Sequence, residues 1–313
     1  EFTKRAFMNG RIDLTQAEAI IDIIEAKTED SLSLAVSQLD GTVSSFVKDV
    51  REQLIAMIAH LEVTIDYPEE DIEEVTSQEV RDQLQPILKA MDELLSTANT
   101  GRLIRDGITT VIVGRPNAGK SSLMNALLRE NRAIVTDIPG TTRDSIEEYM
   151  TVEGISLRLI DTAGIRDTQD TVEALGVERA RDYINKADIV LCVIDGSTPL
   201  NPEEIEILTS VSGLNTIVLL NKSDVAQVVT DENIKEHGTF TAIERISAKE
   251  GEGSAVLSKW VQELVYGGRV KQDNSAMISN VRHISLMEQA KAQVEQALSS
   301  IDMGMPVDFV ATD

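Results

Sequence analysis

One glycine-rich segment constrains the fold more than any other part of the chain: Gly114-Arg115-Pro116-Asn117-Ala118-Gly119-Lys120-Ser121. The apolar run 108–113 before it predicts a strand, and the run 121–128 after it predicts a helix. A strand, a glycine-rich turn and a helix in this order are typical of a phosphate-binding loop, whose backbone N–H groups converge on a phosphate. Lys120 would bring a positive charge to the β- and γ-phosphates, and the Ser121 hydroxyl would be a ligand for Mg²⁺.

Beyond this loop, short β-rich runs alternate with helical runs, which indicates the class of fold. The β-rich runs cover residues 108–113, 156–160, 189–194 and 216–220, and a helical pattern covers 172–184. This alternation predicts a mostly parallel sheet with helices on both faces. The one cysteine, Cys192, lies in a β-rich run; a single cysteine excludes an internal disulfide and favours a reducing compartment.

Three further motifs follow strands in the same region. Asp161-Thr162-Ala163-Gly164 offers a carboxylate to the Mg²⁺ shell and the Gly164 N–H to the γ-phosphate. In Asn221-Lys222-Ser223-Asp224, the Asp224 carboxylate can accept hydrogen bonds from guanine N1–H and from its exocyclic amine, whereas adenine has no such donor pair. Ser247-Ala248-Lys249 can donate a backbone N–H to guanine O6. Together with the phosphate loop, these motifs predict a site for GTP rather than ATP.

Between the phosphate loop and the second motif lies the polar, turn-rich segment Asp137-Ile138-Pro139-Gly140-Thr141-Thr142-Arg143-Asp144. It suits a switch in which one threonine binds Mg²⁺ while γ-phosphate is present, and by spacing either Thr141 or Thr142 qualifies. Ras-type enzymes place a water-orienting glutamine directly after the Asp-x-x-Gly motif, but here that residue is Ile165. Either hydrolysis is slow, or another nearby residue positions the water; the candidates are Glu173, Asp167, Asp170 and Arg166.

Helical patterns precede and follow this α/β region. Apolar residues recur at helical spacing in three runs of the first hundred residues and in one run after about residue 268. Pro86 interrupts the third run and weakens the prediction of helix for the residues before it. The acidic cluster 66–71 is better explained as a solvated interhelical loop than as a metal site. We predict an α/β domain of the P-loop GTPase type at 106–268, inserted into an all-α helical bundle formed by 1–105 and 269–313.

The charge and the ends of the chain limit its partners. The net charge is −24, from 53 acidic against 29 basic residues, which disfavours tight binding of nucleic acid by this chain alone. No apolar run is long enough for a membrane span, and no signal peptide is present, so we expect a cytoplasmic protein with no membrane partner. Because the chain begins at Glu1 rather than Met and ends abruptly, we expect it to be a fragment of a longer protein.

With these motifs the sequence resembles the tRNA uridine-modification GTPases of the MnmE (TrmE) family. The resemblance rests on the segment Arg5-Ala6-Phe7-Met8-Asn9-Gly10-Arg11-Ile12-Asp13-Leu14 with Gln16-Ala17-Glu18-Ala19, on Gly114 to Ser122, and on Asp137 to Asp144. It covers essentially the whole chain, and the helical segment distinguishes it from Era- and Der-type GTPases.

The resemblance implies a set of site residues. Two G domains would meet face to face as a homodimer, and K⁺ would replace an arginine finger, with ligands from Asn117, Thr136, Ile138 and Thr141. Mg²⁺ would be bound by Ser121 and Thr142, and Glu173 would be the general base. GTP or GDP would be contacted by Asn117, Ala118, Gly119, Lys120, Ser121, Ser122, Thr136, Asp137, Ile138, Pro139, Gly140, Thr141, Thr142, Asp161, Thr162, Ala163, Gly164, Asn221, Lys222, Ser223, Asp224, Ser247, Ala248 and Lys249.

The resemblance also implies a reaction and further partners. With a flavin-dependent partner, the intact protein would install an aminomethyl or carboxymethylaminomethyl group at C5 of the wobble uridine of tRNA. GTP hydrolysis would drive a conformational cycle, and tRNA would be bound mainly through the complex. A domain for 5-formyl-tetrahydrofolate would precede this chain, with Arg11 at the position of a basic contact to the folate, and a Cys-containing tail would follow it.

Two other functions compete with this interpretation. A ribosome-assembly GTPase of the Era or Der type would need a basic RNA-binding module, and no such segment is found here. A nucleotide-dependent scaffold would use the helices as an assembly stalk and turn over little GTP. K⁺-stimulated multiple turnover distinguishes the scaffold from the enzyme.

Overall fold

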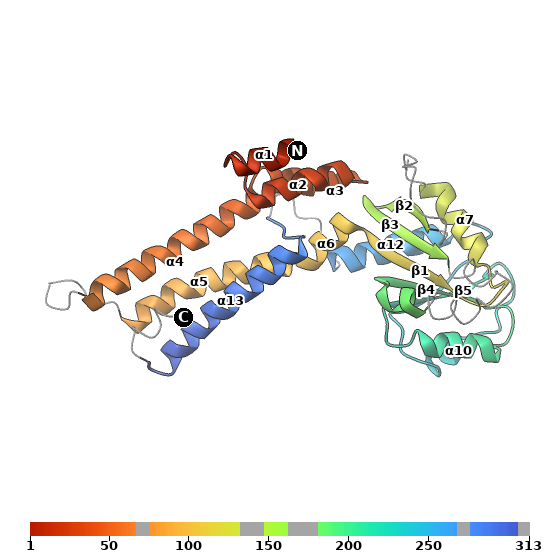
Figure 1. Ribbon diagram of the computed structural model, residues 1–313. Helices are drawn as coiled ribbons and strands as arrows, with labels where there is room; N and C mark the ends of the chain where they lie inside the picture. Colours follow the sequence, from red (N-terminus) through yellow and green to blue (C-terminus); the bar gives the residue numbers. More distant parts are fainter. Residues whose placement is uncertain (67–75, 132–146, 162–180, 268–275, 306–313) are drawn as a thin grey trace, which may run out of the picture. The chain divides into compact units, whose positions relative to one another are not determined.

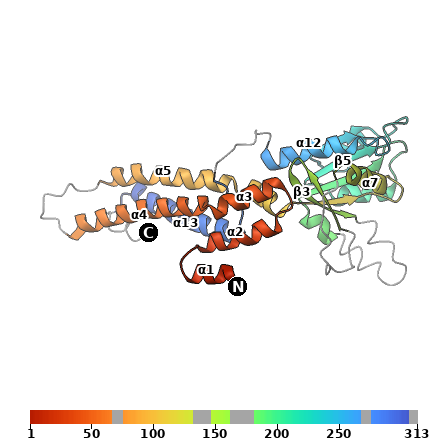
Figure 2. The same ribbon diagram turned by 90° about the horizontal axis from the view of Figure 1, so that it is seen from above.

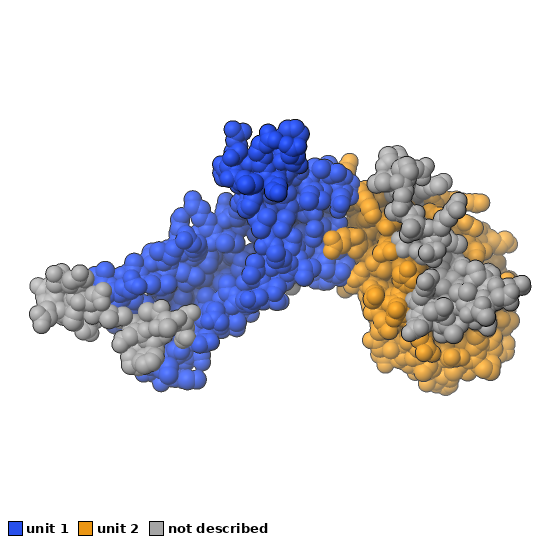
Figure 3. Space-filling view, in the orientation of Figure 1, with its two compact units in different colours: residues 1–26, 31–105, 271–313 blue, residues 27–30, 106–270 orange. Residues whose placement is uncertain are grey.

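The computed structural model describes residues 1–66, 76–131, 147–161, 181–267 and 276–305. The chain divides into two compact units (Figure 3). One contains residues 1–26, 31–105 and 271–313, and the other contains 27–30 and 106–270. The first unit is therefore made of chain segments that lie on either side of the second in the sequence.

The first unit is helical. Its helices are α1 (Phe2–Met8), α2 (Leu14–Glu25), α3 (Glu29–Leu39), α4 (Thr42–Asp66), α5 (Ser77–Ser96), α6 (Ala98–Asp106) and α13 (Val281–Asp302). In both ribbon views, α5 lies beside α4 and α13 and runs antiparallel to them (Figures 1 and 2). Buried residues, all from these three helices except Ile278, fill the space between them: Met57, Leu61, Val80, Leu84, Ile87, Met91, Leu94, Ile278, Met287, Val294, Ala297 and Ile301.

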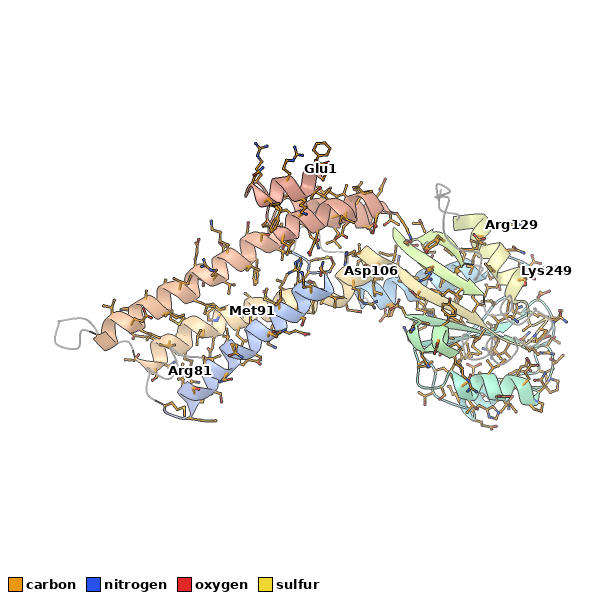
Figure 4. All side chains as sticks on the ribbon, viewed as in Figure 1. Glu1, Arg81, Met91, Asp106, Arg129 and Lys249 are labelled. Atoms are coloured by element: carbon orange, nitrogen blue, oxygen red, sulfur yellow. The ribbon has the colours of Figure 1, made fainter. Side chains whose placement is uncertain are left out.

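Two labelled residues of α5 show how this helix is held. Met91 is fully buried in the core, whereas Arg81 lies near the surface and forms an ion pair with Asp302 of α13 (Figure 4). A second ion pair joins the same two helices, with Lys291 Nζ 2.6 Å from Asp92 Oδ1. The helices α5 and α13, distant in sequence, are thus joined by an apolar core and by two ion pairs at the edge of that core.

The third helical run continues through Pro86, because α5 begins at Ser77 and ends at Ser96. A proline inside a helix removes one hydrogen bond and costs about 3 kcal/mol. Two features offset that cost. A capping box satisfies the helix start, with Thr76 Oγ1 accepting from Glu79 N at 3.2 Å, and Val80 and Leu84 are buried in the core before the proline.

The second unit is a six-stranded sheet with helices on both faces. Its strands are β1 (Ile108–Val113), β2 (Glu147–Val152), β3 (Ile155–Asp161), β4 (Ile189–Asp195), β5 (Thr216–Asn221) and β6 (Ala242–Arg245). Their order across the sheet is β2-β3-β1-β4-β5-β6, and all neighbouring pairs are parallel except β2 with β3. The helices that lie wholly within the described residues of this unit are α7 (Lys120–Asn131), α10 (Pro202–Ser210), α11 (Asp231–Lys235) and α12 (Gly253–Tyr266).

The predicted fold class is confirmed. The four predicted strands match β1, β3, β4 and β5 to within one residue at each end, and the predicted helix 121–128 lies within α7. The edge strand β2 was not predicted, and β6 lies where a strand without stated bounds was expected before Ser247. The predicted helix 172–184 lies mostly outside the described residues, although 181–186 is helical.

The central strands are buried on both faces, as in a sheet covered on two sides. All residues of β4 are buried; Val190, Cys192 and Ile194 pack against Leu208 of α10 and Ile234 of α11 on one face. Burial, together with the nearby charge of Glu204, raises the pKa of the Cys192 thiol to about 12. Cys192 is therefore a core residue, as the sequence predicted. In the described part of the chain, no helix has the length and apolar character needed to cross a bilayer.

A close backbone contact in the helical unit gives a test of its packing. Gly101 of α6 is buried, and a Cβ at this position would lie 2.5 Å from the carbonyl oxygen of Ile278. Glycine to alanine inside a helix normally stabilises by about 1 kcal/mol. We expect Gly101→Ala instead to lower the free energy of unfolding of the helical unit by about 1–3 kcal/mol, because backbone must shift to admit the methyl group.

Urea unfolding followed by helix circular dichroism measures this change. Asn99→Ala is the control, since Asn99 is exposed on the same helix and its substitution should not destabilise. A Gly101→Ala variant as stable as the parent chain would contradict this packing.

Candidate guanine-nucleotide site

The phosphate loop lies between β1 and α7, and two of its glycines have conformations that exclude a side chain. Gly114 has φ +152° and Gly119 has φ +106°. A Cβ on Gly114 would overlap the backbone oxygen of Val193, and one on Gly119 would overlap the side-chain amide of Asn221. Glycine at these two positions therefore lets the loop pack against Val193 and Asn221 in a tightly curled backbone conformation, which fits a loop whose N–H groups converge on a phosphate.

Lys120 closes this cradle on one side. The lysine is buried, and its Nζ donates to the carbonyl oxygens of Gly114 and Arg115, both at 2.8 Å. Ser121 and Ser122 follow in the first turn of α7 and are exposed, where the helix dipole favours anions. Asn117 is also exposed and takes a left-handed backbone conformation with φ 63°. The structure thus brings the predicted phosphate-binding residues of the loop together.

Asn221 links the phosphate loop to the motif Ser247-Ala248-Lys249. It ends β5, is almost fully buried, and uses both ends of its side-chain amide. Its Nδ2 donates to Ala118 O at 2.8 Å, and its Oδ1 accepts from Ala248 N at 3.0 Å. Because β1, β5 and β6 are all parallel, their carboxyl ends share one edge of the sheet, which is where open α/β sheets bind ligands.

The carboxylate predicted to read the base is held by a hydrogen bond from a neighbouring loop. Asp224 is exposed, and its Oδ1 accepts from Ser247 Oγ at 3.0 Å. Ser247 itself is buried, while Lys249, labelled in Figure 4, is exposed at the end of this turn. The two predicted guanine-reading loops are therefore in direct contact, and the carboxylate is at the surface where a base can reach it.

Asp195, at the end of β4, lies between the phosphate loop and the base-reading loop. Its Oδ2 accepts from Lys222 Nζ at 2.6 Å and lies 3.4 Å from a guanidinium nitrogen of Arg115. Burial opposes ionisation, but hydrogen bonds from Lys222 and Ser197 outweigh it and hold the pKa of Asp195 below its ordinary value. Asp195 therefore stays ionised at neutral pH and holds the two loops through their cations.

A second carboxylate behind the loop is completely buried. Glu204 Oε1 accepts from Arg115 Nε at 2.8 Å, and its Oε2 accepts from Asn201 N at 3.1 Å, so it also completes the capping box of α10. A buried charge is tolerated when paired and hydrogen-bonded in this way. Arg115, in the phosphate loop, is thus anchored to the helix that covers the opposite side of β4.

Several predicted site residues cannot be placed. Thr136 to Thr142, Thr162 to Gly164, and Glu173 all lie outside the described residues; Asp161 ends β3. Arg11 is exposed in the connection between α1 and α2. Among the described residues, no cluster of three or more His, Cys, Asp or Glu side chains could hold a metal ion, and of the predicted Mg²⁺ ligands only Ser121 falls in that part of the chain.

Three acids at the site had no assigned role from the sequence: Asp195, Glu204 and Glu252. Asp195 could have been noticed because it ends a predicted strand at the same sheet edge as the other motifs. Glu204 carries the signature of a capping box, three residues after Asn201. Nothing in the sequence alone indicates the contacts that Glu252 makes.

A phosphate loop after β1 and guanine-reading loops after β5 and β6, on a mostly parallel six-stranded sheet, define a P-loop GTPase. Comparison with known proteins agrees and narrows the class. The family model described as the MnmE helical domain matches residues 14–313. The tRNA modification GTPase MnmE of Geobacillus thermodenitrificans is 49% identical over 314 residues, covering 100% of this chain and 68% of that protein. The MnmE of Clostridioides difficile is 47% identical over 313 residues with the same coverage. The chain belongs to the MnmE family.

Solved structures with related sequence include a variant of Aquifex aeolicus Era bound to GDP and AlF4⁻. It is 25% identical with a TM-score of 0.39, over 59% of this chain and 66% of that one. The resemblance to the MnmE family read from the sequence is confirmed by the family model and by the full-length relatives.

The pairing of Arg115 with Glu204 predicts a change in stability. Arg115→Ala would leave the buried Glu204 carboxylate without its cation, at a cost of about 3 kcal/mol or more in the free energy of unfolding. Trp260 in α12 is the single tryptophan of the chain, so its fluorescence during urea unfolding reports on the α/β unit.

The double variant Arg115→Met with Glu204→Gln separates the pair from the general loss of a side chain. It removes both charges of the Arg115–Glu204 pair and keeps an acceptor for the α10 cap, so it should recover most of the lost stability. An Arg115→Ala variant that unfolds at the parent urea concentration would show that the pair does not stabilise the unit.

Proposed function

We propose that this chain binds and hydrolyses GTP and that hydrolysis drives a conformational cycle in the modification of tRNA wobble uridines at C5. The observation that carries the proposal is the assembled base site. Asp224, a carboxylate that can accept from guanine N1–H and the exocyclic amine, is fixed by Ser247, and Asn221 joins this region to the phosphate loop. The tRNA role is supported by membership of a family whose relatives are called tRNA modification GTPases.

The described residues suit binding and orientation of the nucleotide. Lys120 and the N–H groups of the phosphate loop would hold the β- and γ-phosphates, and the Ser121 hydroxyl lies at the start of α7, where a Mg²⁺ ligand is needed. Bound Mg²⁺ would neutralise charge on the phosphates. With Ser121 we assign Thr142 to Mg²⁺, and Glu173 to the role of general base, both by the family resemblance.

We further propose that K⁺ takes the place of an arginine finger. Its ligands would be Asn117, Thr136, Ile138 and Thr141. Asn117 supports this in one respect: it is exposed on the phosphate loop in a left-handed conformation, so its side chain is not used to pack the core. Potassium would supply positive charge to the phosphoryl oxygens, a role worth about 10³–10⁵ in rate where an arginine supplies it.

The remaining features of the proposal concern the whole protein. Residues 106–268 would form the GTPase domain, and 1–105 with 269–313 the helical domain. Two GTPase domains would meet in the active state, and a flavin-dependent partner would bring much of the tRNA-binding surface to this acidic chain, whose net charge is −24. Arg11 would contact 5-formyl-tetrahydrofolate that is bound mainly by another domain.

Base selectivity tests the proposal at Asp224. Asp224→Asn should weaken GTP binding, since hydrogen bonds to a charged group contribute about 1.5–3 kcal/mol, roughly a 10- to 150-fold change in Kd. It should also improve binding of xanthosine triphosphate, whose base presents a carbonyl where guanine has an amine. Isothermal titration calorimetry with both nucleotides measures the exchange of preference, and an unchanged GTP affinity would remove Asp224 from the site.

Ion dependence tests the role assigned to potassium. GTP hydrolysis should be much faster in K⁺ than in Na⁺ at equal ionic strength, and the gain should grow with protein concentration, because the active state needs two copies. Asn117→Ala should abolish most of the K⁺ response, whereas Arg143→Ala and Arg166→Ala, the two candidate local arginines, should keep the ion selectivity. Equal rates in the two salts at high protein concentration would contradict the potassium mechanism, and negligible turnover in either would favour the scaffold.

A further inference from the structure

Glu252 makes contacts that none of the four nucleotide motifs explains. A single oxygen of its carboxylate, Oε2, accepts from the backbone N–H of Ser247 at 2.8 Å and from the hydroxyl of Ser223 at 3.2 Å. Ser223 belongs to the loop after β5, and Ser247 belongs to the loop after β6. One carboxylate oxygen therefore joins the two loops that read the guanine base.

Backbone hydrogen bonds also connect the turn that contains Glu252 to Ser247. The Ser247 carbonyl accepts from Glu250 N at 3.1 Å and from Glu252 N at 3.2 Å, so the turn between β6 and α12 folds back onto Ser247. The side chain of Glu252 does not cap α12, although the residue occupies the N-cap position. Its hydrogen bonds go to the base-reading loops instead of the helix.

These contacts surround the carboxylate that selects guanine. Asp224 Oδ1 accepts from Ser247 Oγ at 3.0 Å, and Asp224 directly follows Ser223 in the chain. The links Glu252–Ser247–Asp224 and Glu252–Ser223–Asp224 form a closed ring. Asp224 is exposed, so this ring of hydrogen bonds can restrain the orientation of its carboxylate where packing does not enclose it.

We propose that Glu252 is a positioning residue that sets the selectivity of the site for guanine by holding Asp224 in place. The inference rests on the proposed function, since it assumes that Asp224 reads the base. A simpler role for an acid at the start of a helix is interaction with the helix dipole. That role affects stability but not the choice between bases, so selectivity distinguishes the two.

The test compares Kd for GDP and for inosine diphosphate, whose base lacks the exocyclic amine. The amine has Asp224 as its partner in this site, so the ratio of the two Kd values reports on the orientation of that carboxylate. Glu252→Ala should raise the Kd for GDP by about tenfold and bring the ratio toward one, as expected for the loss of one to two hydrogen bonds. Glu252→Gln should keep most of the selectivity, because both donors reach one oxygen and a single amide carbonyl can replace it.

Glu250→Ala is the matched control, as a neighbouring exposed glutamate, and should behave like the parent chain. Thermal unfolding without nucleotide shows whether each variant is folded, and the ratio is measured on the folded fraction. A parent chain that does not prefer GDP to ADP would overturn the proposed function itself. If the parent does prefer GDP, then an unchanged ratio in Glu252→Ala, or equal losses in Glu252→Ala and Glu252→Gln, would overturn the role of Glu252 as hydrogen-bond acceptor.

Discussion

The carboxamide of Asn221 joins two loops that are more than a hundred residues apart, and it does so inside the protein, where each partner would otherwise be left unpaired. Its amide donates to Ala118 O and its oxygen accepts from Ala248 N. An unsatisfied buried backbone group costs about 1–3 kcal/mol, so both loops are held in register by one side chain. Gly119 is part of the same constraint, because any side chain there would occupy the position of the Asn221 amide. The loop predicted to bind phosphate and the loop predicted to read the base are thus held by the same side chain, that of Asn221.

Charged groups surround this neutral link and extend it to the rest of the α/β unit. Asp195 holds Lys222 and Arg115, and Arg115 in turn pairs with the fully buried Glu204. Buried ion pairs are weak evidence of net stability, because desolvation offsets the attraction. Here these pairs hold the side chains of Lys222 and Arg115 in place beside the carboxyl ends of the strands. The exposed residues Asp224, Ser121 and Asn117, which we propose contact the nucleotide, lie beside this network.

The sequence was sufficient for the elements whose signal is local. Central strands such as β4 are continuous apolar runs, and the phosphate loop has a spacing that few other structures share. The edge strand β2 was missed because its sequence, from Glu147 to Val152, mixes acidic with apolar residues and forms no continuous apolar run. Pro86 weakened the prediction of helix before it because proline disfavours a helix interior, whereas in the structure the burial of Val80 and Leu84 offsets that cost. The contacts of Glu204 with Arg115 and of Glu252 with Ser223 could not be predicted, since these partners are distant in sequence and a charge pattern does not show which groups meet.

Asn221 is therefore the residue on which the connection between the two loops depends most directly. The decisive measurement is the affinity of Asn221→Ala for a fluorescent GDP analogue, compared with the parent chain and accompanied by Trp260 fluorescence to confirm that the α/β unit is folded. We expect the folded variant to bind at least tenfold more weakly, because neither Ala118 O nor Ala248 N keeps its partner and both loops lose their common anchor; this follows from a loss of about 1.4 kcal/mol or more. A folded variant that binds the analogue as tightly as the parent would contradict the account.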